Sequence, residues 1–170
     1  MPLRPLLFAA ALVVALAGCP TDPAGPAIQI GTGEPGEEFV PLAGGEVLFV
    51  TQGPQGCCHV WGSLRVSGIE AGNPDDVSEV RNPTMEFELL VEGASIVSEG
   101  DATQGLETAP ASAAPYTHEF IGRRVLLDIL NDDAFEDGVD AVFSVSVDDV
   151  EGIHLSASVD VLLEPHPFNE

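Results

Sequence analysis

The residues of this chain best suited to chemistry stand in one short stretch. Cys57, Cys58 and His59 are consecutive, and Trp61 and Arg65 follow them. Adjacent Cα atoms lie about 3.8 Å apart, below the usual disulfide range of about 4.4–6.8 Å, so a bond between Cys57 and Cys58 closes a strained ring. Three interpretations are open: a vicinal disulfide or an inert thiol pair, a Cu(I) or Zn(II) site that adds His59, and a cross-link to another chain or no bond at all.

A strand that starts at Cys58 divides this stretch between two faces. The apolar face carries Cys58, Val60, Leu64 and Val66. The other face carries His59, Trp61, Ser63 and Arg65. An exposed Trp beside polar groups is a common anchor for partners, so we expect His59, Trp61 and Arg65 to form a partner-binding stripe. The alternative is that Trp61 only covers the edge of the fold.

A second group of oxygen-bearing side chains lies between two predicted strands, in residues 131–140. It contains Asn131, Asp132, Asp133, Glu136, Asp137 and Asp140. Calcium binds about six to eight oxygen ligands, so the composition suits Ca²⁺. The spacing fails the EF-hand pattern, because Gly138 at the sixth position puts Phe135 at the third. An inter-strand calcium site built from Asp132, Asp133, Glu136, Asp137 and Asp140 is the candidate, and a solvated acidic turn is the alternative.

The sequence carries no catalytic motif that we can defend. Ser63 and His59 could be combined with an aspartate, but the Gly-x-Ser-x-Gly context of a nucleophile is missing from the sequence. The phosphate-binding Gly-Lys-Ser/Thr and the zinc-binding His-Glu-x-x-His patterns are missing too. We therefore expect a protein that is not an enzyme.

Acidic residues dominate the charge of the chain. It has 28 Asp and Glu against five arginines and no lysine, and a formal net charge of −23. Nucleic-acid binding needs cations that neutralise phosphates, so this composition excludes nucleic acid as a partner.

The N-terminus has the order of an export signal: Arg4, an apolar run from Leu6 to Ala17, and then Gly18 and Cys19. A membrane-spanning helix needs about 20 apolar residues, more than this run provides. Leu16-Ala17-Gly18-Cys19 resembles the lipobox of bacterial lipoproteins. The resemblance implies cleavage before Cys19, its lipidation and a membrane anchor, and the absence of Asp after Cys19 implies the outer membrane. The alternative is an ordinary secretory signal with a chance cysteine.

The sequence predicts three segments. Residues 1–18 are the predicted signal peptide, and residues 19–37 are a tether rich in Pro and Gly. Ile28 and Ile30 could add a short edge strand to it. Residues 38–170 are expected to form one domain, since about 130 residues with this many apolar side chains can build one core.

Alternation with a period of two predicts β-strands. Met85, Phe87, Leu89 and Val91 alternate with mostly acidic residues. Residues 141–147 and 153–163 alternate similarly around the turn Asp149–Gly152, which predicts a long hairpin. Further candidate strands are residues 46–51, 58–69, 94–98, 116–121 and 123–130, whereas residues 100–115 are expected to form a disordered loop.

These patterns predict an all-β fold, an antiparallel two-sheet sandwich of about seven or eight strands. The closing hairpin resembles the last strands of immunoglobulin-like domains in bacterial envelope proteins. Residues 53–66 resemble a segment of uncharacterised predicted envelope lipoproteins, which implies no known activity. We expect a non-catalytic, lipid-anchored binding, adhesion or structural module of the cell envelope, whose partner is another envelope protein or a polysaccharide. The alternative is a metal-handling protein for Cu, Zn or Ca.

Overall fold

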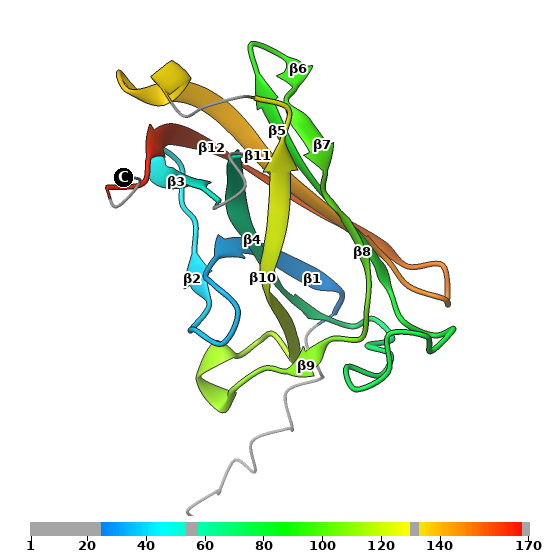
Figure 1. The fold of residues 1–170 in the computed structure, drawn as a ribbon. Coiled ribbons are helices and arrows are strands. Elements are labelled where there is room, and N and C mark those ends of the chain that lie inside the picture. The colour runs from blue at the N-terminus through cyan, green and yellow to red at the C-terminus, as the bar shows by residue number, and fades with distance from the viewer. Residues whose placement is uncertain (1–24, 54–57, 130–132, 168–170) are drawn as a thin grey trace, which may run out of the picture.

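The computed structural model describes residues 25–53, 58–129 and 133–167, and nearly all regular structure in them is strand. This confirms the predicted all-β class. In the described part, seven strands have six or more residues, and Figure 1 shows their arrangement. They are β1 (Ala27–Thr32), β3 (Glu46–Gln52), β4 (Cys58–Ser67), β5 (Thr84–Val91), β10 (His118–Leu127), β11 (Val139–Asp148) and β12 (His154–Pro165).

Five shorter strands and two single 3₁₀ turns complete the described structure. They are β2 (Val40–Pro41), β6 (Ala94–Ser95), β7 (Val97–Glu99), β8 (Asp101–Thr103), β9 (Glu107–Thr108), η1 (Ala111–Ala113) and η2 (Asp133–Phe135). The prediction that residues 100–115 form a disordered loop was therefore wrong. Leu106 anchors this segment, because its side chain is buried and its N–H donates to the carbonyl of Ala71 at 2.8 Å.

The strands with the clearest alternation follow their predicted faces. In β5, Met85, Phe87 and Leu89 are buried, and in β11 Phe143 and Val145 are buried. β11 and β12 pair along ten residues, from Val139 opposite Leu163 to Asp148 opposite His154, which confirms the predicted hairpin.

The topology differs from the predicted pair of antiparallel sheets. The structure has one twelve-stranded sheet that is not closed. β3 joins its two halves, since Val47 to Val50 pair in parallel with β12 while Thr51 and Gln52 pair antiparallel with β4. Side-chain alternation along a strand does not show which strand will be its neighbour, so the sequence could not reveal this parallel pairing.

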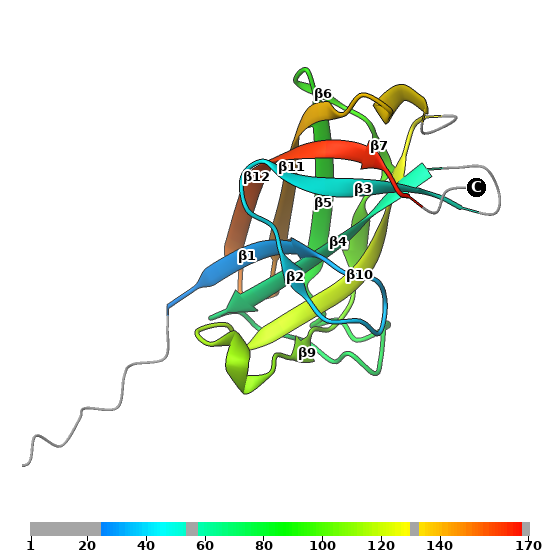
Figure 2. The same cartoon turned by 90° about the vertical axis from the view of Figure 1, so that its left-hand side faces the viewer.

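The two halves of the sheet face one another across the core, and Figure 2 shows β5 and β11 behind β1, β4 and β10. Gly62 of β4 lies against Phe87 of β5, because a Cβ there would meet the ring at 2.7 Å. Phe87 in turn stacks on Phe143 with ring centroids 6.0 Å apart. The absent side chain at Gly62 thus makes room for the aromatic centre of the core.

The sheet begins earlier than residue 38. β1 lies inside the predicted tether and pairs with β2 on one side and β4 on the other. Ile28 and Ile30 do form a strand, and Ile30 is buried. The expected extent of the tether to residue 37 is therefore corrected: β1 and the segment after it belong to the folded part.

Residues 116–121 and 123–130 were predicted as two strands, but β10 spans both with a bulge between Phe120 and Arg123. Gly122 sits in the bulge with φ +85°, a backbone conformation that favours glycine, and Pro35 packs directly over it. On the edge away from β4, β9 pairs with His118 and Glu119, and β7 pairs with Leu126 and Leu127. Between them, β10 has a stretch of edge that no described strand covers on that side.

Candidate functional site: the hollow beside Trp61

β4 has the two faces that the sequence predicts, but the polar face is largely covered. Cys58, Val60, Leu64 and Val66 are fully buried in the core. On the other face His59 is only 6% exposed and Ser63 is fully buried. The expectation of an exposed stripe was therefore wrong at His59. Near Arg65 the segment after β1 folds across this face: Phe39 packs against Gly31, and its ring centroid lies 4.3 Å from Cζ of Arg65.

Arg65 is committed to contacts within the fold. Its Nε donates to Oε2 of Glu119 at 2.8 Å, and its guanidinium lies over the Phe39 ring. The side chain is 17% exposed. A charge already paired and stacked in this way has little capacity for a partner, so Arg65 does not belong to the candidate site.

Trp61 keeps its prominent position and has His59 as a neighbour. The two rings meet edge to face, with centroids 4.9 Å apart. Burial, followed by the nearby charge of Arg124, lowers the pKa of His59 below its ordinary value of 6.5. His59 is therefore neutral near pH 7 and supports the Trp61 ring as an uncharged neighbour.

A hollow of about 390 Å³ opens on one side of Trp61, beside the uncovered stretch of β10. We call it the Trp61 hollow. Its lining comes from β4, β7, β8, β10 and the segments next to β1 and β8: Pro35, Trp61, Glu99, Ala102, Gln104, Phe120, Gly122, Arg123, Arg124 and Leu126. Trp61 also lines a second hollow of about 180 Å³, together with residues that include Thr32, Val40 and Phe49.

The lining of the Trp61 hollow carries two arginines and one carboxylate, Glu99, so its local charge is positive although the whole chain is acidic. Arg123 donates from Nη2 to Oε1 of Glu99 at 3.0 Å. Arg124 is exposed, lies directly opposite Trp61 in the β4–β10 pairing, and forms no salt bridge with the described residues. Directly opposite residues of an antiparallel pair project to the same side of the sheet, so Arg124 and Trp61 can contact one ligand.

Two hydrogen-bond donors on this wall have no acceptor in the part of the chain that is described. They are Nε1 of Trp61 and Nε of Arg123, and both atoms are buried.

Sequence reasoning missed Arg123 and Arg124. A signal was present, because the chain after Cys19 has only four arginines and two of them are adjacent. In an acidic protein without lysine, two adjacent arginines are unusual and indicate a candidate binding surface. The position of Trp61 opposite Arg124 could not be predicted from the sequence, since the pairing of β4 with β10 joins distant parts of the chain.

Some residues of the cysteine and metal predictions lie outside the part of the chain that the structure describes. Cys19 and Cys57 lie outside the described residues, and Cys58 is fully buried on the core face. Cys58 and His59 project to opposite faces of β4, so the structure does not bring these two candidate metal ligands together.

Within the acidic segment, residues 133–140 are described, and Phe135 anchors them because it is only 3% exposed. Glu136, Asp137 and Asp140 are exposed, whereas Asp132 and the side chain of Asp133 lie outside the described residues. Across the described ranges, no group of three or more His, Cys, Asp or Glu side chains is placed to hold a metal ion.

No family model, curated protein or solved structure matches this chain. In residues 25–53, 58–129 and 133–167 no helix has the length and apolar character needed to cross a membrane. The assignment of a function therefore rests on the residues of the site.

Proposed function

We propose that this protein is a lipid-anchored, non-catalytic binding module of the bacterial cell envelope, held at the outer membrane through Cys19. The facing halves of the sheet would serve as an immunoglobulin-like sandwich scaffold, with the ligand at the edge of β10. The Leu-Ala-Gly-Cys sequence at residues 16–19 supports the anchor, and seven long strands around one core support the scaffold.

The ligand we propose is a polysaccharide segment that carries carboxylate groups. The observation behind it is the position of Arg124, a cation without a salt bridge in the described part of the chain, directly opposite Trp61 on the wall of the Trp61 hollow. A sugar ring packs its C–H face on an indole, and a guanidinium binds a carboxylate through paired hydrogen bonds. The volume of about 390 Å³ is within the common range for small-ligand sites.

Calorimetric titration with trigalacturonic acid tests this ligand class. We expect Arg124→Gln to weaken binding by about tenfold or more, because a hydrogen bond to a charged group is worth about 1.5–3 kcal/mol. Arg81→Gln is the matched control, since Arg81 is 62% exposed and its contacts to Glu70 and Glu79 are 3.6 Å and 3.8 Å long. Its affinity should equal that of the parent protein.

The methyl ester of the same trisaccharide separates charge from ring stacking. We expect the parent protein to bind the ester more weakly than the acid. We expect Arg124→Gln to bind the ester and the acid with equal affinity. Equal affinity of the parent protein for acid and ester, or no measurable binding of either, would rule out carboxylate recognition at this hollow.

The anchor is tested by expressing the full chain in a bacterium fed with labelled palmitate. We expect label on the parent protein and none on Cys19→Ser, with the mature mass starting at the acylated Cys19. Recovery of an unlabelled parent protein that retains residues 1–18 would contradict the anchor while leaving the ligand proposal open to its own test.

A further inference from the structure

The outward face of the sheet loses its polar character at one end. Along β11 the outward side chains are Ser144 and Ser146 in the middle, but Val142 nearer its start. On the neighbouring strands Leu90 and Leu162 occupy outward positions beside it. The pattern continues onto β3, where Val47 lies opposite Leu162 and Phe49, next along the same face, is 42% exposed.

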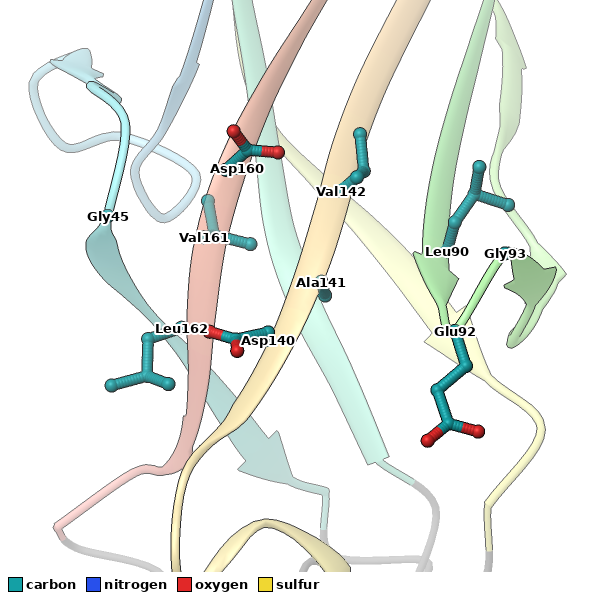
Figure 3. Close-up of a pocket in the computed structure, with 10 residues that line it drawn as sticks. All are labelled: Gly45, Leu90, Glu92, Gly93, Asp140, Ala141, Val142, Asp160, Val161 and Leu162. Carbon is teal, nitrogen blue, oxygen red and sulfur yellow. The ribbon is translucent and has the colours of Figure 1, made fainter.

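This apolar end of the face is hollowed into a groove of about 540 Å³. Figure 3 shows Leu90, Val142 and Leu162 in it, together with the carboxylates of Glu92, Asp140 and Asp160. The strand pairing sets their order, because Val142 lies opposite both Leu90 and Asp160, and Asp140 lies opposite Leu162. The groove therefore alternates aliphatic and acidic side chains across three neighbouring strands.

The charge of the groove selects its occupant. Three of its lining residues are acidic, none is basic, and the whole chain has a formal charge of −23. A second copy of this protein would bring the same carboxylates to the contact, and an anionic lipid surface would be repelled. A cationic segment would be attracted both by the groove and by the field of the whole molecule.

We propose that this groove docks a segment of a partner protein in which aliphatic residues alternate with lysine or arginine. The aliphatic side chains cover Leu90, Val142 and Leu162, and the cations pair with Glu92, Asp140 and Asp160. This surface is separate from the Trp61 hollow, with which it shares none of its lining residues.

A fluorescent eight-residue peptide of alternating leucine and lysine is the probe, with binding followed by anisotropy near physiological salt. Val142→Ser places on β11 the residue already present at Ser144 and Ser146, so folding should be retained. We expect it to weaken binding about tenfold, because the buried apolar contact of one valine is lost. Ser146→Ala, on the same face outside the groove, should bind like the parent protein.

A second pair of variants tests the acidic residues of the groove. Asp140→Asn should weaken the peptide several-fold, whereas Glu86→Gln, an outward acid of β5 outside the groove, should have no effect. Arg124→Gln should leave peptide binding unchanged, so failure here and failure of the saccharide proposal are distinguishable.

Several outcomes would overturn the docking proposal. Equal losses for Asp140→Asn and Glu86→Gln would mean diffuse attraction to an acidic surface, and equal affinity of Val142→Ser and the parent protein would mean that the apolar groove is not used. A leucine–glutamate peptide that binds as tightly would contradict charge complementarity. A dimer in sedimentation that Val142→Ser dissociates would make a second copy the occupant.

Discussion

At the scale of single residues, burial changes what His59 and Trp61 can do. The sequence places them on a polar face, yet in the fold His59 is only 6% exposed. His59 therefore acts as a neutral packing partner of Trp61 and not as an exposed polar contact. The cation beside Trp61 is instead Arg124 of β10, which forms no salt bridge with the residues that the structure describes.

The lowered pKa of His59 makes folding stability sensitive to pH. Burial, and then the charge of Arg124, holds the folded pKa below the unfolded value of 6.5, so the unfolded chain takes up this proton first as the pH falls. The contribution of neutral His59 is complete above pH 6.5 and is lost as the pH falls toward the folded pKa. We expect urea unfolding to show a lower free energy at pH 5.5 than at pH 7.5, with a smaller difference in His59→Gln. A variant with the same difference as the parent protein would contradict this assignment.

At the scale of elements, the β11–β12 turn is held by Asp149. Its Oδ1 accepts from the N–H of Ile153 at 2.8 Å, and its Oδ2 accepts from the N–H of Glu70 at 2.9 Å. Burial raises the pKa of Asp149, but the backbone N–H donors around the carboxylate outweigh burial and hold the pKa below its ordinary value of 3.8. One side chain thus fastens the closing hairpin to the segment after β4.

We expect Asp149→Ala to lower the free energy of unfolding by about 2–3 kcal/mol, because two partly buried N–H groups lose their acceptor. Asp148→Ala is the control: its carboxylate is 60% exposed and contacts only His154 in the described structure, so about 0.5 kcal/mol or less is expected. Equal losses in denaturant unfolding would show that Asp149 does not hold the turn. Since the pKa of Asp149 is lowered, its contribution should be present above pH 3.8 and be lost as the pH falls below it.

At the scale of the whole molecule, self-repulsion is the main electrostatic effect. The chain has 28 acidic residues, and its few arginines can pair with only a small part of them. Such a surface attracts cationic partners and opposes the compact state at low ionic strength.

Raising NaCl from 20 mM to 500 mM at pH 7.5 should therefore increase the melting temperature by a few degrees. Salt screens the repulsion, and a gain of about 1 kcal/mol in the free energy of unfolding raises the melting temperature by that amount in a domain of this size. Near the sequence pI of about 4.1 the same change should have a much smaller effect, because the net charge there is close to zero. A melting temperature that falls with salt at pH 7.5 would mean that attractive ion pairs outweigh the repulsion.

The sequence by itself determined the features that depend on neighbours along the chain. The two-residue alternation of β5 and β11 predicted their strands and inward faces, and Asp149–Gly152 predicted the turn of the closing hairpin. It also determined the acidity of the chain, from which we predict that nucleic acid is not a partner. These properties are local or additive, so no knowledge of the partner strands was needed.

Only the tertiary structure decided which residues meet. It placed β3 parallel to β12, brought Arg124 opposite Trp61, folded Phe39 over Arg65, and aligned Leu90, Val142 and Leu162 in one groove. A period of two tells which side of a strand a residue occupies, but not which strand lies next to it or what covers its face. Those choices follow from contacts between distant segments, and both proposed binding surfaces are built from them.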